Sequence, residues 1–110
     1  MVNMASREPF SLIYAPQVWR QLRFIDRQFH PWIRRAIEQQ LQHQPDVETR
    51  NRKPLTRPVE FEADWEIRFG PANRFRVFYR IVPDRHEVHI LAVGIKEGNR
   101  LLLGGLEVST

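Results

Sequence analysis

The chain has 110 residues, the usual size of one domain, and its 42% hydrophobic and 27% charged residues are those of an ordinary folded protein. It contains no cysteine, which excludes disulfide bonds and thiolate metal sites. The formal net charge is +4, and nearly all basic residues are arginines, so a polyanion or an acidic protein is a candidate partner. The alternative is a soluble surface that is simply basic.

Targeting and ligand signals are lacking. The first residues, MVNMASREPF, contain no apolar run of signal-peptide length, and no stretch approaches the roughly 18 apolar residues of a membrane span. We therefore expect a soluble, cytoplasmic protein whose residues 1–110 form a single domain. We expect no metal and no other cofactor, because no ligand spacing is recognisable among the histidines, which are His30, His43, His86 and His89.

The N-terminal part predicts a strand followed by two helices. Residues 9–15 alternate as a short strand, and Pro16 suits the first turn of a helix. The first helix is expected to run to near His30, because Pro31 disfavours helical geometry in the residue before it. Pro31 opens a second helix that ends by Gln44. The two apolar stripes consist of Val18, Leu22, Ile25 and Phe29, and of Ile33, Ile37 and Leu41.

The C-terminal half predicts strands. Residues 45–59 contain three prolines and read as an irregular basic connector, either a phosphate-contacting loop or a solvated linker. Alternation of apolar and polar residues then begins at Glu60 and continues over residues 61–69, 75–81 and 88–93, with turn sequences between these segments and Gly94 at the end. The tail after it is a final strand, a packed tail or a partner-binding segment. The predicted fold is α+β: an N-terminal strand, a helical hairpin and an antiparallel β-meander, with the helices on one face of a small twisted sheet.

The alternation predicts the strand register. Residues that face each other across antiparallel strands share a side of the sheet, so the apolar side should pair Trp65 with Tyr79, Ile67 with Val77 and Phe69 with Phe75. The next hairpin should pair Ile81 with Val88, Tyr79 with Ile90 and Val77 with Ala92.

The other side of the sheet should then be basic. It pairs Arg68 with Arg76, with Glu66 between them, and Asp64 with Arg80, while Val93 lies beside Arg76 and His89 beside Arg80. Two guanidinium groups repel unless an anion lies between them. This pattern indicates either an anion-binding site or a ladder of surface salt bridges, which contribute about 0–1 kcal/mol each.

The order of these segments and their local sequences resemble the RelE/ParE superfamily of bacterial type II toxin–antitoxin systems. The matching blocks are KPL at 53–55, WEIR at 65–68, FRVFYRI at 75–81 and VHILAVGIKEGNRL at 88–101. The resemblance covers nearly the whole chain. It implies that the open, concave face of the sheet meets RNA, that RelE-like members cut mRNA on the ribosome, and that a cognate antitoxin holds the toxin in a hetero-oligomer.

The resemblance also implies site residues. The family's arginine matches Arg76, its basic residue in the preceding strand matches Arg68, and the basic residue after the last glycine matches Lys96 or Arg100. Glu66 lies where some members carry a catalytic carboxylate. RNA cleavage needs a base for the 2′-hydroxyl, which Glu66 supplies, an acid for the leaving oxygen, for which His89 is a candidate, and charge on the phosphate stabilised by Arg68 and Arg76. The catalytic candidates are Glu66, Arg68, Arg76 and Lys96. The RNA- or phosphate-binding candidates are Arg52, Lys53, Arg74, Arg80, His89 and Arg100.

One departure keeps other functions open. RelE-like nucleases often carry a histidine or tyrosine near the C-terminus, whereas this chain has no aromatic residue after Tyr79. A ParE-like inhibitor of DNA gyrase needs no nuclease residues. A non-catalytic member that only binds RNA or its antitoxin is the third possibility.

Overall fold

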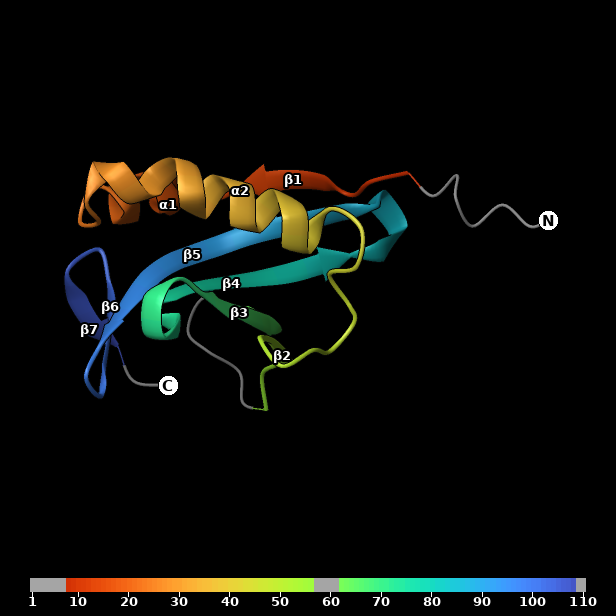
Figure 1. Ribbon diagram of the computed structural model, residues 1–110. Coiled ribbons are helices and arrows are strands. Elements are labelled where there is room, and N and C mark those ends of the chain that lie inside the picture. Colours follow the sequence, from red (N-terminus) through yellow and green to blue (C-terminus); the bar gives the residue numbers. More distant parts are fainter. Residues whose placement is uncertain (1–7, 57–61, 109–110) are drawn as a thin grey trace.

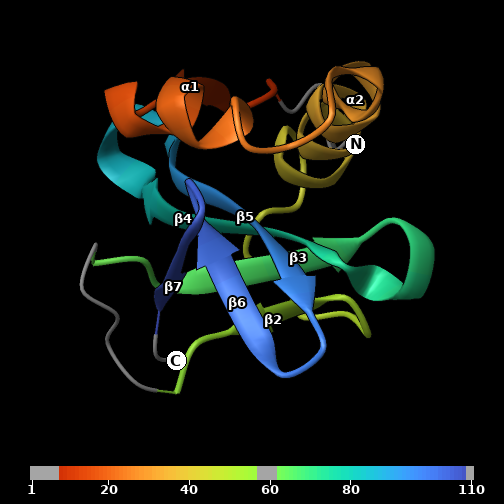
Figure 2. The same cartoon turned by 90° about the vertical axis from the view of Figure 1, so that its left-hand side faces the viewer.

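The computed structural model describes residues 8–56 and 62–108, and in it two helices cover one face of a β-sheet (Figures 1 and 2). The predicted α+β class and the placement of the helices are confirmed. The helices are α1 (Pro16–Leu22) and α2 (His30–Leu41). The strands are β1 (Ser11–Tyr14), β2 (Arg52–Pro54), β3 (Trp65–Phe69), β4 (Phe75–Val82), β5 (Glu87–Glu97), β6 (Arg100–Leu103) and β7 (Leu106–Val108).

The sheet is the predicted meander, extended at both ends. Its strand order is β2-β3-β4-β5-β6-β7, with antiparallel neighbours throughout. β1 lies parallel to the first half of β5, from Ser11 beside Glu87 to Tyr14 beside Ile90. β5 is therefore the central strand, and it carries β1 along one half of an edge and β6 along the other.

The first helix is shorter than the sequence predicts. α1 ends at Leu22, and a separate 3-10 turn, Arg27–Phe29, precedes α2. The Asp26 carboxylate accepts a hydrogen bond from the Gln28 backbone N–H at 3.1 Å, which starts the new turn. The His30 ring nitrogen Nε2 lies 2.8 Å from the Leu22 carbonyl, which also accepts from the Ile25 N–H at 3.0 Å, and 2.9 Å from the Ile25 carbonyl, so the ring links the end of α1 to the start of α2. The apolar stripe alone could not reveal these side-chain caps.

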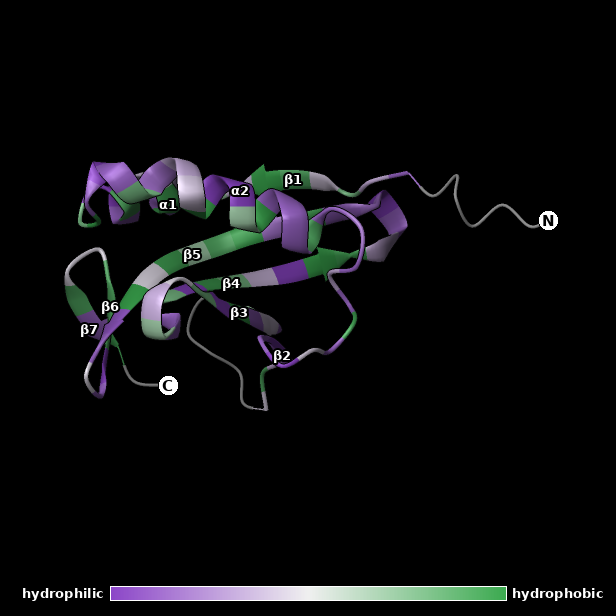
Figure 3. Cartoon of the chain, in the orientation of Figure 1, coloured by the Kyte–Doolittle hydropathy of each residue, from purple (hydrophilic) through white to green (hydrophobic). Residues whose placement is uncertain are grey.

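The core lies between the helices and the sheet. Val18, Ile33, Ile37 and Leu41 pack from the helices against strand residues such as Ile67, and all are essentially buried. In Figure 3, β5 is largely hydrophobic whereas α2 alternates between hydrophobic and hydrophilic residues, as a helix with one covered face requires.

Two further predictions, in the C-terminal half, were also wrong. The connector expected to lack regular structure contains the edge strand β2, which pairs Arg52 with Ile67 and Lys53 with Glu66. A strand of three residues forms there because its backbone groups pair with those of β3. The strand expected to end at Gly94 continues to Glu97, since β6 pairs with its last residues. The start of the strand expected from Glu60 lies at residues 57–61, outside the described residues, and β3 itself begins at Trp65.

The register between β3 and β4 is confirmed from Trp65 to Phe69, and that between β4 and β5 only in part. The predicted pairing of Asp64 with Arg80 is wrong, because β3 begins at Trp65 and the carboxylate near Arg80 is that of Glu62, 3.8 Å away. Trp65 pairs with Tyr79, Ile67 with Val77 and Arg68 with Arg76. On β5, Ile90 faces Tyr79 as expected, but a bulge between Phe78 and Tyr79 shifts the later pairs, so Val93 rather than Ala92 faces Val77. A bulge inserts one residue and reverses the alternation beyond it, which the simple period of two did not foresee.

The connector after α2 is fastened to the sheet by buried polar groups. The Tyr79 hydroxyl, fully buried, donates a 2.6 Å hydrogen bond to the Pro45 carbonyl. Arg52 reaches the same region, where its guanidinium donates to the Val47 and Gln40 carbonyls at 2.8 and 3.1 Å and to Gln40 Oε1 at 2.6 Å. The two side chains link the end of the helical layer to β4 and to the edge strand β2.

Replacing Tyr79 by phenylalanine is expected to lower the free energy of unfolding by about 1–3 kcal/mol at neutral pH, because the buried Pro45 carbonyl loses its donor. Burial, reinforced by the charge of Asp46 and opposed by that of Arg52, raises the pKa of Tyr79 above its ordinary 10.0. As the pH rises above 10, the unfolded chain ionises this phenol while the folded protein keeps it protonated, so stability falls. The variant should therefore lose less stability than the wild type above pH 10.

Urea unfolding at pH 7 and at intervals between pH 9 and 11.5 measures both effects. Tyr14, whose pKa burial also raises, is present in both proteins, so the difference between them isolates Tyr79. Parallel stability curves for the two proteins above pH 10 would contradict the prediction.

Candidate functional site

A buried carboxylate lies between two guanidinium groups on the open face, the side of the sheet away from the helices. Glu66 Oε2 is 3.1 Å from Arg76 Nη1, and Glu66 Oε1 is 3.4 Å from Arg68 Nε. Only 8% of the Glu66 side chain is exposed. We call these three residues the Glu66 cluster. The predicted placement of Glu66 between the two arginines is confirmed.

The two arginines differ in their freedom. Arg76 is 11% exposed, and its Nε also donates to the Asn73 carbonyl at 3.0 Å, so two sides of its guanidinium are fixed. Arg68 is 44% exposed and has only its Nε held. An anion at the cluster would therefore meet one arginine already in place and one that can move towards it.

The turn Pro71–Asn73 supplies the carbonyl that holds Arg76. The sequence marked this segment only as a turn, and it gave no sign that Asn73 serves the site through its backbone. Ala72 and Asn73 have φ angles of 53° and 52°, a region that L-residues seldom occupy. Gly70 precedes them with φ 83°, where a Cβ would lie 2.4 Å from the Phe75 ring. Strained backbone of this kind is typical of functional sites.

The structure brings two of the other candidates to the open face beside the cluster. Lys53 pairs with Glu66 across β2 and β3, although its Nζ lies 3.3 Å from Glu48 Oε2. Gly94 pairs with Arg76, and Lys96, two residues later, is roughly 7–8 Å from Arg76 between Cα atoms, as diagonal neighbours are. Lys96 has no ion partner among the described residues, so its ammonium group is available to a ligand.

The remaining candidates are dispersed. Arg80 pairs with His89, and His89 Nε2 lies 2.9 Å from Glu87 Oε1. Arg80 is four residues from Arg76 on the same strand, roughly 13 Å at the usual rise. Arg74 and Arg100 form exposed ion pairs with Glu97 at 3.9 Å and with Glu107 at 3.2 Å. Pairs of this kind contribute about 0–1 kcal/mol.

Arg52 lies on the other side of the sheet. It is 5% exposed, pairs with Ile67, and uses its guanidinium to hold the connector, as described above. The structure therefore does not bring Arg52 to the Glu66 cluster. Its basic neighbours in the sequence gave no hint of this, because burial depends on the register of β2.

A second apolar cluster covers part of the open face, which the sequence did not predict. It is built from residues of β4, β5 and β6, so the tail strands that extend the sheet beyond β5 also bury apolar side chains on its open face. The residues at its centre are Ala63, Phe78, Ala92, Leu101 and Leu103. Of the alternatives for the tail, a strand is confirmed, although the tail forms two, β6 and β7, and the signal for the first was the three consecutive leucines.

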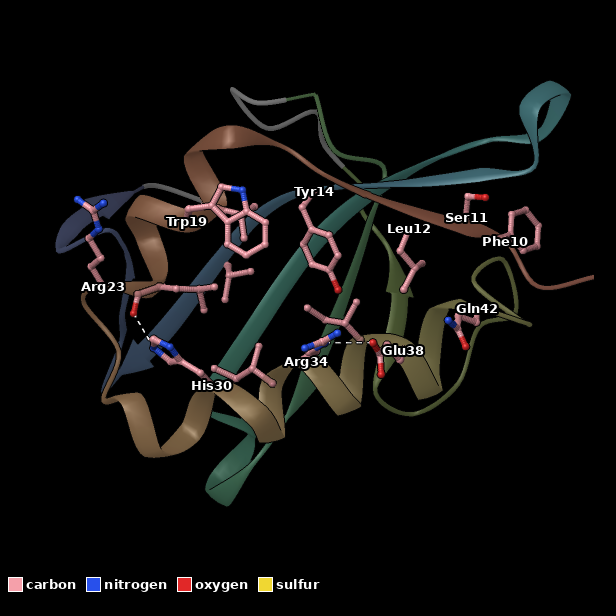
Figure 4. Close-up of a pocket in the computed structure, with 15 residues that line it drawn as sticks. Phe10, Ser11, Leu12, Tyr14, Trp19, Arg23, His30, Arg34, Glu38 and Gln42 are labelled. Atoms are coloured by element: carbon pink, nitrogen blue, oxygen red, sulfur yellow. Dashed lines mark hydrogen bonds and ion pairs between the residues drawn. The ribbon is translucent and has the colours of Figure 1, made fainter.

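A separate groove lies on the helical side, between β1, α1 and α2 (Figure 4). Its volume is about 800 Å³, and its floor is apolar, with Leu12, Val18 and Ile33 among the lining residues. Trp19, 56% exposed, packs on Tyr14 at the wall with ring centroids 5.4 Å apart. Burial, with a smaller effect of Glu38, raises the pKa of Tyr14.

The described residues show neither a metal-binding cluster nor a membrane-spanning helix. Residues 8–56 and 62–108 contain no group of three or more histidine, aspartate or glutamate side chains that could hold a metal ion. In that part of the chain, no helix combines the length and the apolar character needed to cross a membrane.

Comparison with known proteins places the fold. No protein-family model and no curated protein matches the sequence. The structure is similar to one chain of the toxin–antitoxin complex RelBE2 from Mycobacterium tuberculosis, with a TM-score of 0.66 and 23% sequence identity. The match covers 83% of this chain and 95% of that one. At this identity the likeness is one of fold, and it confirms the RelE-like architecture predicted from the sequence.

Proposed function

We propose that this protein is the toxin of a type II toxin–antitoxin system and that it cleaves mRNA on the ribosome. The observation that carries the proposal is the Glu66 cluster, a buried carboxylate held between two arginines on the open face of a RelE-like sheet. A carboxylate that is fixed beside guanidinium groups can take a proton while the arginines stabilise developing negative charge. These are two of the three tasks in RNA cleavage.

The proposed reaction uses the 2′-hydroxyl of RNA as nucleophile. Glu66 takes the 2′-hydroxyl proton, the 2′-oxygen bonds to phosphorus, and the bond from phosphorus to the 5′-oxygen breaks. Arg68 and Arg76 stabilise the charge on the phosphate oxygens. Lys96 gives a proton to the leaving 5′-oxygen, because it lies nearer to Arg76 than His89 does. The products are a 2′,3′-cyclic phosphate and a 5′-hydroxyl end, and no metal takes part.

Induced expression tests this activity. Growth arrest should come with new mRNA 5′ ends that carry hydroxyl groups and cluster at ribosome-bound codons. Arrest with intact mRNA would overturn the nuclease proposal.

A gyrase inhibitor is the second candidate. It is favoured by one observation: among the described residues, no imidazole or phenol forms a hydrogen bond or ion pair with the Glu66 cluster, and His89 faces Arg80, two strand positions from the Phe78 that faces Glu66. A gyrase inhibitor predicts stalled gyrase–DNA complexes and an SOS response with no RNA cuts. The same induction experiment therefore separates the two functions.

We further propose that the antitoxin occupies the groove between β1, α1 and α2 with an amphipathic segment. The apolar floor offers a place for its apolar side chains. Arg23 and Arg34 line the groove, and Arg34 Nε is paired with Glu38 Oε2 at 3.3 Å, so Arg23 is the charge that an acidic group of the partner would meet first. The partner is expected to be encoded in the reading frame beside this one.

Co-purification with the product of the adjacent reading frame tests this partner. Trp19→Ser should weaken the complex at least tenfold, because exposed aromatic anchors dominate interface energies. Trp32→Ser is the matched control, since Trp32 is 41% exposed but does not line the groove. Equal affinity of the two variants would contradict binding in this groove.

A further inference from the structure

The bulge in β5 decides which residues reach the open face. Tyr79 and Phe78 are consecutive on β4, but their partners on β5 are Ile90 and Ala92, so Leu91 is the inserted residue. Before the bulge, His89 shares the open face with Arg80. After it, Ala92 and Gly94 face Phe78 and Arg76 on that side, and Lys96 follows in the same alternation.

Without the inserted residue the alternation would be reversed. Val93 would then lie beside Arg76, as the sequence predicts, Ile95 would also lie on the open face, and Lys96 would point towards the helices. In the structure Val93 is fully buried in the helix-side core and Ile95 packs against it. The bulge thus places a lysine on the open face and two apolar residues in the core.

The bulge also places the tail. Gly94 faces Arg76, and a Cβ at Gly94 would lie 2.3 Å from Leu103 Cδ2 and 2.7 Å from the Leu102 carbonyl oxygen. A register without the bulge would put a valine at this crossing point. The second apolar cluster could not form in that register, because β6 could not approach so closely.

Two glutamines of α1 hold the bulged backbone. β1 stops pairing with β5 at Ile90, and β6 starts at Ile95, so the backbone between them has no strand neighbour on that edge. Gln17 Nε2 donates to the Leu91 carbonyl at 3.1 Å, and the Val93 N–H donates to Gln21 Oε1 at 2.9 Å. Gln17 and Gln21 are four residues apart and so share one face of the helix. Their amides replace the missing strand.

We propose that Gln17 and Gln21 are positioning residues that fix the β5 bulge and thereby hold Lys96 on the open face beside the Glu66 cluster. The role assigned to Lys96 rests on the proposed RNA-cleaving function. The placement of Lys96 by the two glutamines does not.

The two glutamines have opposite hydrogen-bonding roles, which gives a matched test. Gln21 accepts, so Gln21→Glu keeps an acceptor for the Val93 N–H. Gln17 donates, so Gln17→Glu sets a carboxylate against the Leu91 carbonyl. The same chemical change should therefore be tolerated at one position and not at the other. A role in helix packing alone would make the two variants alike, because both residues lie on the same face of α1.

Two measurements on the purified full chain test this prediction: hydrogen exchange of the Val93 amide and the NMR signal of methylated Lys96. Hydrogen exchange of the Val93 amide should be at least tenfold faster in Gln17→Glu and within twofold of wild type in Gln21→Glu. The chain has two lysines, Lys53 and Lys96. After ¹³C-methylation, the Lys96 signal should move in Gln17→Glu and stay in Gln21→Glu, with the Lys53 signal constant in both. Unchanged exchange and an unchanged Lys96 signal in Gln17→Glu would overturn the proposal, as would equal changes in the two variants.

Titration with a 2′-O-methyl hexanucleotide separates this proposal from the proposed function. The wild type and Gln21→Glu should shift the Lys96 signal on addition of this uncleavable RNA, and Gln17→Glu should need at least tenfold more RNA. If RNA shifts Lys96 in none of the proteins while the exchange rates differ as expected, the positioning role stands. The RNA site of the proposed function would then be wrong.

Discussion

Replacing Glu66 by glutamine is expected to slow RNA cleavage by about 10²–10⁴-fold, the usual contribution of a general base. The amide is nearly the same size, and its oxygen can still accept from Arg76 Nη1 across the present 3.1 Å. The amide cannot take the 2′-hydroxyl proton. RNA affinity should not fall, because the change removes a negative charge from the phosphate site. Single-turnover cleavage and fluorescence anisotropy with an uncleavable RNA measure the two quantities.

Glu62→Gln is the matched control for this variant. Glu62 Oε1 lies 3.8 Å from Arg80 Nη1, so it too is a carboxylate paired with an arginine, but its side chain is 83% exposed. Its loss should leave cleavage within about twofold of wild type, as expected for an exposed pair. A Glu66→Gln protein that cleaves RNA at the wild-type rate would remove Glu66 from the mechanism.

Replacing Arg76 by alanine is expected to affect folding and cleavage together. Glu66 would remain buried with Arg68 as its only guanidinium, 3.4 Å away and half exposed. Breaking a buried ion pair by removing one partner costs about 3–5 kcal/mol. Loss of a fixed electrostatic group should also lower the cleavage rate by about 10²–10³-fold. Urea unfolding and single-turnover cleavage measure these losses.

The double variant Glu66→Gln/Arg76→Ala separates the two effects. The neutral amide leaves no buried charge unpaired, so most of the lost stability should return while cleavage stays at least as slow as in the single variants. If the single and the double variant are equally unstable, the unpaired Glu66 charge is not the cause. If the double variant cleaves RNA at the wild-type rate, neither residue is catalytic.

The pattern of residues predicted much of the site, for a physical reason. Alternation with a period of two assigns each residue to a face, and burial of Ile67 and Val77 then requires Arg68 and Arg76 to face each other with Glu66 between them. A register shifted by one residue would bury arginines without partners. The β3–β4 pairing and the Glu66 cluster were therefore predictable from local pattern alone.

The pattern failed where a distant segment supplies the partner. Asp26 and His30 end one helix and begin the next through side-chain contacts that the apolar stripe does not encode. Arg52 belongs to a basic connector by sequence, yet the pairing of β2 with β3 turns it to the helical side. In both cases the decisive contact depends on tertiary position.

The residue pattern was enough to predict the order of the elements, the face of β3 and β4 that is buried, and the carboxylate that is buried between two arginines. Hydrophobic burial fixes these, because each follows from spacing within one short segment. Three features became apparent only in the folded protein: the bulge in β5, the side on which Lys96 lies, and the packing of the tail over Phe78. These features depend on Gln17 and Gln21, which lie 74 and 72 residues from their partners in the chain. The two side chains form hydrogen bonds with β5 where its edge has no neighbouring strand. The alternation of apolar and polar residues within one segment cannot predict a hydrogen bond over that separation.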